Sequence, residues 1–457
     1  MSKGRTFLSI AIIFGVFACS KPSKSPAGEE KTLKKDGNEK TSVEKKEIKK
    51  TVVEKKTVKP EKPVTEKPLE VVAPGVKVKV DKDALNTTIK GNRNFTFNVL
   101  KLLEDKKTNL FFSPASILSA MAMTYNGSSG SEKKEFEKVL GFDADYEKNS
   151  AAVNHMYDYS DVKGKFKLTA ANRIFVSDSF KLREPFLKLN ATYFSSSIQR
   201  LDFKDPGKAV GVINKWVEDK TSRLIKDLVK KEHITEDTRL LLVNAIYMKA
   251  DWLSQFKKTN SWDGKFNGPD GKTKVRYMTQ TAYFKSGSLK DGDFLEMEYS
   301  GRRLSMVIAL PEKGSEPLKF IQKMDGEKLN KAISGLKSRK TSVTIPKFSF
   351  EKGFSLKKVL IKLGMPVSFS DMAKFKKMAF EDLKIQDVIH KARVDVDEKG
   401  TEAAAATAVI MMKAGGMPIK EEIFHFTADR PFVFFIRDTL TGHIIFAGVL
   451  NNPEYKK

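Results

Sequence analysis

The segment Glu398-Lys399-Gly400-Thr401-Glu402-Ala403-Ala404-Ala405-Ala406-Thr407 combines residues that favour different secondary structures. Its run of alanines favours a helix, whereas the preceding residues, Ala392–Asp397, alternate as in a half-buried strand. Farther along, Gly415-Gly416 and Met417-Pro418 interrupt any regular element. Natural sequences are mostly locally consistent, and conflicts of this kind gather at functional sites. The segment is therefore predicted to occupy two different places in the fold.

The size and charge of the chain limit the kind of protein to which this segment belongs. The chain has 457 residues, a formal net charge of +26 and 40% hydrophobic residues, which is enough for a large buried core. Its lysines are scattered, with short clusters within Lys226–Lys231 and Lys374–Lys377. No nucleic-acid motif or aromatic-interleaved stripe accompanies them. We therefore interpret the charge as a solvated lysine-rich surface and expect no nucleic acid partner.

The N-terminus has the pattern of an export signal. Lys3 and Arg5 precede an apolar run that ends at Ala18, is about 12 residues long and is too short to span a bilayer. Val16-Phe17-Ala18-Cys19 resembles a bacterial lipobox and holds the only cysteine of the chain. Residues 1–18 are thus predicted to form a lipoprotein-like signal peptide, with Cys19 as the lipidation site. The alternative is an ordinary signal peptide with an incidental cysteine.

The rest of the chain divides into two parts by composition. Residues 19–80 are rich in Lys, Glu and Pro and contain no aromatic residue, so we expect a disordered tether. Residues 81–457 are globular in composition. A lipid on Cys19 would anchor this domain through the tether to a bacterial membrane, either the outer membrane or the cell envelope. The expected location is therefore extracellular or on the cell surface.

Hydrophobic periodicity predicts helices mainly in the first half of the globular part and strands mainly in the second. Ser113 is predicted to cap a helix that begins at Pro114. Amphipathic patterns cover Asn92–Leu103, Ala209–Lys220 and Arg223–Lys230, and strands are expected at Leu168–Val176, Arg239–Lys249, Leu304–Leu310, Thr341–Ile345, Phe432–Phe435 and Gly442–Val449. The fold class is therefore predicted to be α+β with large, mainly antiparallel sheets.

Motifs for catalysis or for binding a metal or a cofactor are missing from the sequence. Its five histidines have no metal-ligand spacing, and no HExxH motif occurs. Gly271-Lys272-Thr273 could end a phosphate-binding loop, but Phe266 stands where its first glycine is required. Gly127-Ser128-Ser129-Gly130 does not fit a nucleophile elbow. We expect no enzyme activity, no cofactor and no metal, and a hydrolase remains only an unlikely alternative.

Several short blocks of residues follow one another along the globular part. They are Asn109–Ile117, Asn214–Val217, Leu242–Tyr247 with Trp252 and Phe256, Pro346-Lys347-Phe348, Leu363-Gly364-Met365, His390-Lys391-Ala392, the segment Glu398–Thr407, and Ala428–Phe432. In this order, the blocks make residues 81–457 resemble a serpin. The resemblance implies a serpin fold with three mainly antiparallel sheets, about eight or nine helices and an exposed reactive-centre loop. It also implies a suicide-substrate inhibitor of serine proteases, in which the cleaved loop inserts into the main sheet and traps the acyl-enzyme. A non-inhibitory serpin that acts as a surface binding protein is the alternative.

The resemblance also assigns roles to individual residues. The hinge of the loop is implied to be Glu398, Gly400, Thr401, Glu402, Ala403, Ala404, Ala405, Ala406 and Thr407. Alternation along a strand then directs Thr401, Ala403, Ala405 and Thr407 inward, and these small, uncharged residues are typical of inhibitory serpins. Ser113, Ser116, Asn244 and His390 match a polar cluster under the centre of the main sheet. Trp252 matches a residue at the top of that sheet, and Lys347 and Glu398 match an ion pair near the base of the loop.

Spacing from Glu398 in the family places the reactive bond at Ala414–Gly415. That bond would suit an elastase-like protease, whereas the alternatives Lys413 and Met412 would suit trypsin-like and chymotrypsin-like or elastase-like enzymes. The expected partners are therefore a target serine protease and, through Cys19, a membrane, and the protein is expected to be a monomer. Cysteine proteases are a secondary possibility. Phe142–Asn154 is acidic, which argues against polyanion activation through that segment.

Overall fold

The structure is a computed structural model that describes residues 79–162, 165–194, 198–401 and 422–454. Its described α-helices are α1 (Lys82–Leu103), α2 (Pro114–Tyr125), α3 (Gly130–Leu140), α4 (Tyr146–His155), α5 (Glu184–Phe194), α6 (Pro206–Lys220), α7 (Pro317–Lys323), α8 (Gly326–Ser334) and α9 (Lys357–Leu363). Short 3-10 turns lie at η1 (Ser160–Val162), η2 (Lys231–His233), η3 (Lys258–Asn260) and η4 (Val367–Phe369). The nine described α-helices and the mixed α+β class agree with the prediction.

The larger of the two sheets formed by the described strands has nine strands. They are β1 (Leu110–Phe112), β5 (Trp262–Gly268), β6 (Gly271–Leu289), β7 (Gly292–Glu298), β8 (Leu304–Leu310), β9 (Lys337–Pro346), β13 (Phe424–Thr427), β14 (Phe432–Asp438) and β15 (Ile444–Leu450). Their order is β1-β15-β14-β8-β7-β6-β9-β13, with β5 paired to β6. The prediction of three sheets is therefore wrong. The long strand β6 pairs in turn with β5, β9 and β7 along its length and so joins what would be two sheets into one.

The smaller sheet has six strands and contains Gly400 and Thr401 from the segment Glu398–Thr407. Its strands are β2 (Phe166–Ser177), β3 (Ile198–Leu201), β4 (Leu240–Asp251), β10 (Phe348–Ser355), β11 (Asp387–Val396) and β12 (Gly400–Thr401), in the order β10-β11-β12-β4-β2-β3. Most described pairings in both sheets are antiparallel, but β11 pairs with β4, β2 with β3 and β13 with β9 in parallel.

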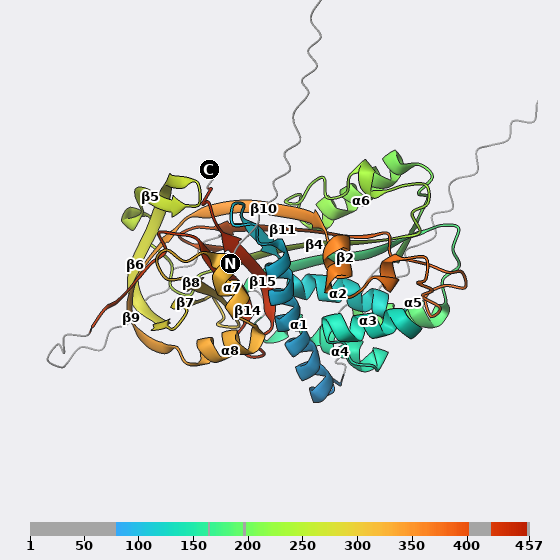
Figure 1. The fold of residues 1–457 in the computed structure, drawn as a ribbon, viewed down its shortest axis with the longest axis horizontal. Helices are drawn as coiled ribbons and strands as arrows, with labels where there is room; N and C mark the ends of the chain where they lie inside the picture. The colour runs from blue at the N-terminus through green and yellow to red at the C-terminus, as the bar shows by residue number, and fades with distance from the viewer. Residues whose placement is uncertain (1–78, 163–164, 195–197, 402–421, 455–457) are drawn as a thin grey trace, which may run out of the picture. The chain divides into compact units, whose positions relative to one another are not determined.

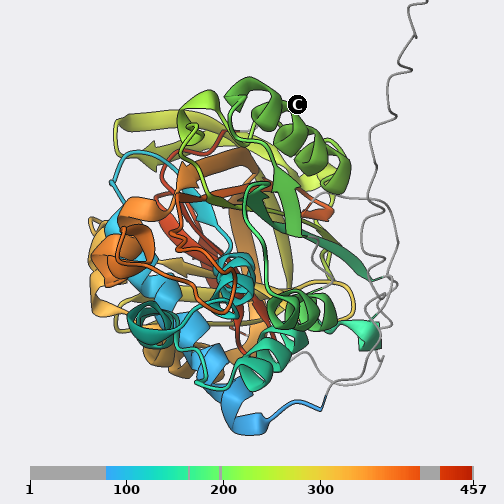
Figure 2. The same cartoon turned by 90° about the vertical axis from the view of Figure 1, so that its right-hand side faces the viewer.

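Both faces of β4 are covered, which explains its almost continuous apolar sequence. Leu241, Val243 and Ala245 pack with α6 on one face. On the other face, Leu242 belongs to the core that includes α1 and α2. Figures 1 and 2 both show α6 on the opposite side of the six-stranded sheet from α2, α3 and α4. The central strands of this sheet are therefore sandwiched between helices over part of their length.

Most of the elements that local patterns in the sequence predicted are present in the structure. Ser113 accepts a hydrogen bond from the Ser116 N–H at 3.1 Å and caps α2, as predicted. The strands predicted at Leu304–Leu310, Arg239–Lys249 and Leu168–Val176 correspond to β8, β4 and β2. The amphipathic stretch Arg223–Lys230 forms no helix. Arg223 and Asp227 have positive φ values of 63° and 49°, which interrupt any helical repeat.

Three groups of predictions lie outside the described residues. They are the signal peptide 1–18 with the Cys19 lipidation site and almost all of the tether 19–80; the hinge residues Glu402, Ala403, Ala404, Ala405, Ala406 and Thr407; and the reactive-bond candidates Met412, Lys413, Ala414 and Gly415. The reactive-centre loop falls in the same range. The domain boundary at residue 81 stays a prediction, although Asp81 is the N-cap of the first described helix.

Candidate functional site

The chain reverses direction after β11 and returns into the same sheet as β12. The Asp397 carboxylate accepts hydrogen bonds from the N–H groups of Lys399 at 2.9 Å and Gly400 at 3.3 Å, which fixes the turn. Thr401 then pairs antiparallel with Val396 on β11 and with Ala250 on β4. The first two residues after this turn are therefore already a short strand between the two central strands.

Below this short strand, β11 and β4 come together. They pair directly, in parallel, from Asp387↔Leu241 to Ala392↔Ile246. This described pairing ends there. It does not include the next residues, which are Arg393–Asp395 on β11 and Tyr247–Lys249 on β4. Their described neighbours in the sheet are β10 and β2, and no described pairing joins these two stretches to each other. A strand that continued from Thr401 in the register of β12 would run between them.

Gly400 is required by the close approach of its backbone to β4. A Cβ atom at this position would lie 2.1 Å from the Ala250 carbonyl oxygen and 2.6 Å from the Asp251 Cα atom. Both contacts involve backbone atoms, which cannot move aside as a flexible side chain could. Any larger residue would therefore push β12 away from β4.

A buried ion pair holds the turn that leads into β12. Glu398 Oε2 lies 2.9 Å from Lys347 Nζ, and Ser261 Oγ donates a hydrogen bond of 2.8 Å to Glu398 Oε1. Only 4% of the Glu398 side chain is exposed, so this ion pair is screened by solvent much less than a surface pair would be. Burial by itself raises the pKa of Glu398, but the contacts with Lys347 and Ser261 outweigh it and lower the pKa below its usual value.

Trp252 lies at the end of the six-stranded sheet and contacts the same turn. Its ring stacks on Tyr299 at 4.5 Å between centroids, and its Nε1–H donates to the Asp397 carbonyl at 3.0 Å. The Tyr299 and Thr401 hydroxyls are 2.8 Å apart and hydrogen-bonded. Thr401 is buried. No pattern in the sequence indicated Tyr299 or Ser261, because both reach the site from distant segments.

The four predicted central polar residues come together under β4 and β11. The Ser113 hydroxyl donates to the Ile445 carbonyl at 2.6 Å, and Asn244 Nδ2 donates to the Ser116 carbonyl at 2.9 Å and to the Ser116 hydroxyl. Asn244 Nδ2 also donates to Asn172, a β2 residue that the sequence analysis missed. Helix α2, three strands of the six-stranded sheet and β15 are thus linked through one buried cluster.

His390 is held neutral in this cluster by geometry and burial. The Ser113 N–H donates to His390 Nε2 at 3.1 Å, so Nε2 carries no proton. His390 Nδ1 therefore holds the ring proton and donates to Asn244 Oδ1. Complete burial lowers the pKa of His390 to about 3. Protonation at Nε2 would also set one hydrogen-bond donor against another.

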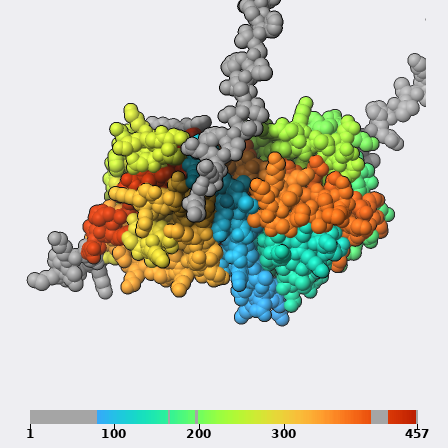
Figure 3. Space-filling view, in the orientation of Figure 1, coloured from blue at the N-terminus to red at the C-terminus, as the bar shows by residue number. Residues whose placement is uncertain are grey.

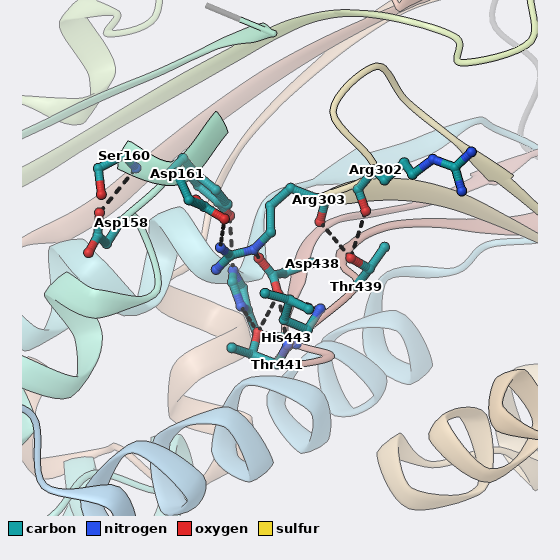
Figure 4. A network of polar contacts seen from close by, with 11 residues as sticks. Asp158, Ser160, Asp161, Arg302, Arg303, Asp438, Thr439, Thr441 and His443 are labelled. Carbon is teal, nitrogen blue, oxygen red and sulfur yellow. Dashed lines mark hydrogen bonds and ion pairs between the residues drawn. The ribbon is translucent and has the colours of Figure 1, made fainter. Parts of the chain in front are cut away.

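A second buried polar network, shown in Figure 4, lies between η1 and the β14–β15 connection. Arg303 Nε bonds Asp438 at 2.6 Å, and another Arg303 nitrogen bonds Asp161 at 2.9 Å. His443 Nδ1 lies 2.7 Å from the Thr441 hydroxyl, and burial lowers the pKa of His443 to about 4. The sequence analysis assigned no role to these residues. Their contacts tie the segment before β2 to the larger sheet.

The described site residues therefore form two groups along one pair of strands. Glu398, Gly400, Thr401, Trp252 and Lys347 gather where β12 enters the sheet. Ser113, Ser116, Asn244 and His390 gather farther down, where β11 and β4 still pair. A strand that lengthened from Thr401 would run from the first group to the second.

Comparisons with known proteins agree with this arrangement. Residues 90–453 match the family model described as serpin (serine protease inhibitor). An uncharacterized serpin-like protein of Thermococcus kodakarensis is 36% identical over 79% of this chain and 84% of its own length. Human serpin B4 is 32% identical over 81% of this chain and all of its own.

Solved structures give the same result for the fold. The native structure of the thermophilic serpin tengpin matches with a TM-score of 0.73 and 28% identity, over 82% of this chain and 95% of that chain. Human thyroxine-binding globulin complexed with its hormone matches with a TM-score of 0.73 and 26% identity, over 81% of this chain and 100% of that chain. From its sequence match and its fold, this chain belongs to the serpin family.

Proposed function

We propose that this protein inhibits serine proteases as a suicide substrate. In this proposal the protease cleaves the loop after Thr401 and is held as an acyl-enzyme while the freed loop enters the six-stranded sheet. The observation that carries the proposal is β12: Gly400 and Thr401 already lie between the two strands that must separate. The entering strand would form backbone hydrogen bonds to β11 on one side and to β4 on the other, which supplies the driving force for insertion.

The pairing register of β12 predicts where each following residue would lie. Thr401 stands opposite Val396 and Ala250, so Ala405 would stand opposite Ala392 and Ile246. These last two residues already pair with each other, which shows that the registers of β11, β12 and β4 are mutually consistent. Residues 402–404 would stand opposite Arg393–Asp395 and Tyr247–Lys249, which form no described pair with each other. Entry of Ala405 and the residues after it requires β11 and β4 to separate.

The side chains of the loop suit the two faces that they would meet. Residues directly opposite in a sheet share a face, so Ala403 and Ala405 would face the core. Thr407 would stand opposite Asn244 and His390, where its hydroxyl could join the buried polar cluster. Glu402 would point to the other face, opposite Lys249 and Asp395, neither of which is fully buried. No inserted charge would have to enter the core.

The length of the central strands bears on the bond that is cleaved. In the same register, residue 410 would stand opposite Asp387, where β11 begins, and Leu241, near the start of β4. A protease bound beyond that residue would be carried to the far end of the sheet. We therefore retain Ala414–Gly415 as the first candidate bond, with Lys413 and Met412 as alternatives. The corresponding targets are elastase-like, trypsin-like and chymotrypsin-like enzymes.

The direct test is to incubate the chain with elastase, trypsin and chymotrypsin and to separate the products on a denaturing gel. A band at the summed mass of protein and protease supports trapping. The N-terminal sequence of the released peptide then identifies the cleaved bond. Cleavage by each protease without such a band would overturn the proposal and favour a non-inhibitory serpin, a class suggested by the match to thyroxine-binding globulin.

The proposed location rests on the N-terminal sequence. We retain Cys19 as a lipidation site that would tether the serpin domain to a bacterial membrane at the cell surface. None of the described helices is long and apolar enough to cross a membrane. Growth with a labelled fatty acid tests the anchor: the protein should carry label, and Cys19→Ala should not. A labelled Cys19→Ala protein would contradict the anchor.

A further inference from the structure

The turn between β7 and β8, residues 299–303, contacts the six-stranded sheet at the level where β12 enters it. Phe166 on β2, Ala250 on β4 and Thr401 on β12 lie in one row across that sheet. Tyr299, at the start of the turn, is hydrogen-bonded to Thr401 at 2.8 Å. A turn of the larger sheet is therefore joined to the first row of the proposed insertion path.

The same turn also holds the segment that precedes β2. Arg303 Nη1 lies 2.9 Å from a carboxylate oxygen of Asp161 in η1, and its guanidinium carbon lies 5.3 Å from the centroid of the Tyr159 ring. Tyr159 packs edge-to-face on Phe166, the first residue of β2, with 5.1 Å between the ring centroids. Arg303 therefore connects the larger sheet to the start of β2.

Gly301 allows the turn and this segment to pack closely. It has a positive φ of 86°, and a Cβ atom at this position would lie 2.9 Å from the Lys165 Cβ atom and 3.5 Å from a Val162 methyl carbon. A side-chain carbon so close to the backbone cannot move aside easily. The contact between the turn and the residues before β2 is therefore tight.

Arg303 has one buried partner and one exposed partner, as Figure 4 shows. The Asp438 side chain, 2.6 Å away, is fully buried, whereas the Asp161 side chain is 52% exposed. Loss of Asp161 would therefore leave Arg303 neutralised by Asp438. The contribution of Asp161 is to join two parts of the molecule rather than to compensate a buried charge.

Entry of a strand requires β4 to separate from β11, and the contacts of β10 and β11 indicate which side moves. Lys347 alone joins β10 to β9 of the larger sheet. Before β11, the N–H groups of Val367 and Ser368 donate to the Glu135 carboxylate on α3 at 2.7 and 2.8 Å. Figure 3 shows this connection, in orange, beside α1, in blue, and the teal region that contains α3. We therefore expect β4 to move, and β2 with it because the two strands pair from Phe166 to Val176.

We propose that the ion pair between Asp161 and Arg303 is a latch that holds β2 against the larger sheet and slows entry of the strand after Thr401. The inference rests on the proposed inhibitory function, because the entering strand is the reactive loop. When β2 moves with β4, Asp161 leaves Arg303 while Asp438 stays. Water can replace this half-exposed contact, which makes the latch releasable. Its release is then one part of the barrier that keeps the intact sheet closed.

Hydrogen–deuterium exchange of the full chain tests the latch without any insertion. In Asp161→Ala, the amides at the start of β2, near Phe166, should exchange several-fold faster than in the wild type, because β2 has lost a contact outside its own sheet. Asp158→Ala is the matched control. It removes the same charge three residues away, where the carboxylate accepts a hydrogen bond from the Ser160 N–H at 3.2 Å. Equal exchange in the two variants would overturn the latch.

A synthetic peptide that copies residues 401–411 measures strand entry without a protease. We expect the peptide to enter the sheet of Asp161→Ala about threefold faster than that of the wild type, as suits the loss of a half-exposed ion pair. Asp158→Ala should take it up at the wild-type rate, and native gels follow the uptake.

Two outcomes of the peptide experiment separate the latch from the proposed function. Entry at equal rates into Asp161→Ala and the wild type would overturn the latch and leave the inhibitory function intact. Failure of the peptide to enter any of the three proteins would contradict strand entry itself, and with it both proposals.

Discussion

At the residue scale, two buried groups hold the central strands in their closed arrangement. Glu398 keeps its charge in a nearly solvent-free site because Lys347 and Ser261 satisfy it. His390 stays neutral because the Ser113 N–H occupies its free nitrogen and burial disfavours the charged ring. In both cases the charge state of one side chain depends on partners that are far away in the sequence. Each group can be tested separately.

Acidification should destabilise the protein through His390. Its folded-state pKa of about 3 lies below the ordinary value of 6.5, so the unfolded chain binds the proton first and stability falls as the pH drops from 6.5 toward 3. Between pH 7 and pH 5 the loss from this residue is about 2 kcal/mol. Urea unfolding at the two pH values measures it.

His390→Asn provides the control for this prediction. His443, with a pKa of about 4, contributes a loss of similar size in the same direction. The variant should therefore keep about half of the pH dependence of the wild type, whatever its stability at pH 7. If the variant and the wild type lose equal stability on acidification, His390 is not the titrating group.

Removal of Lys347 should strand a buried charge. Lys347→Met leaves the Glu398 carboxylate buried without its counter-ion, so we expect the free energy of unfolding to fall by about 3 kcal/mol. Adding Glu398→Gln to that variant removes the stranded charge and should restore most of the loss. The four proteins form a double-mutant cycle measured by urea denaturation. Additive effects of the two substitutions would show that the pair is not coupled.

At the element scale, the decisive feature is the register shared by β4, β11 and β12. Thr401 on β12 pairs with both β11 and β4, and the consistent registers predict the face of every residue that could follow. Helix α6 covers one face of the sheet, so the strands beside it must shift if a long strand is to enter. Position along the loop therefore determines whether a substitution affects insertion.

A charge at an inward position should block insertion, whereas a charge at its outward neighbour should not. Ala405→Glu would place a carboxylate between Ala392 and Ile246, which are fully buried, and an unpaired ion there is strongly disfavoured. We expect this variant to be cleaved without forming a covalent complex. Ala404→Glu would face the other side, opposite Arg393, and should still trap the protease. Equal trapping by both variants, measured on denaturing gels, would refute the register.

At the scale of the whole serpin domain, the native fold is predicted to be a kinetically trapped state. A polar cluster holds β11 and β4 together where they pair directly, below Thr401. A complete central strand between β11 and β4 would hydrogen-bond to both strands and bury the inward-facing alanines. The stability of the molecule should therefore depend on whether the loop is intact.

Cleavage of the loop should raise the melting temperature by roughly tens of degrees, because the inserted strand adds a ladder on each side. Circular dichroism melts of the intact and cleaved chain measure the change. Cleaved Ala405→Glu is the control and should melt close to its own intact form. Equal melting temperatures for intact and cleaved wild type would exclude insertion.

The sequence by itself determined the family, helices such as α1, α2 and α6, strands such as β2, β4 and β8, and the hinge composition, because these depend on local periodicity and on short blocks. The four alanines and the flanking threonines already indicated a segment suited to two environments. Ser113, Ser116, Asn244 and His390 were also predicted to meet. The number of sheets was predicted wrongly, because the continuity of β6 through three partners is a property of pairing rather than of local pattern.

Only the tertiary structure decided how the hinge is held. Ser261, Tyr299 and Asn172 reach their partners from distant segments, and no spacing in the sequence announces them. The ion pair between Asp161 and Arg303 also became visible only in the fold, because 142 residues separate the two along the chain. Burial and buried partners shift the pKa values of Glu398 and His390, because the same side chain on the surface would keep an ordinary pKa. Short-range sequence patterns determine where the helices and strands form. Long-range contacts determine the pKa values and the stability of the buried groups within them.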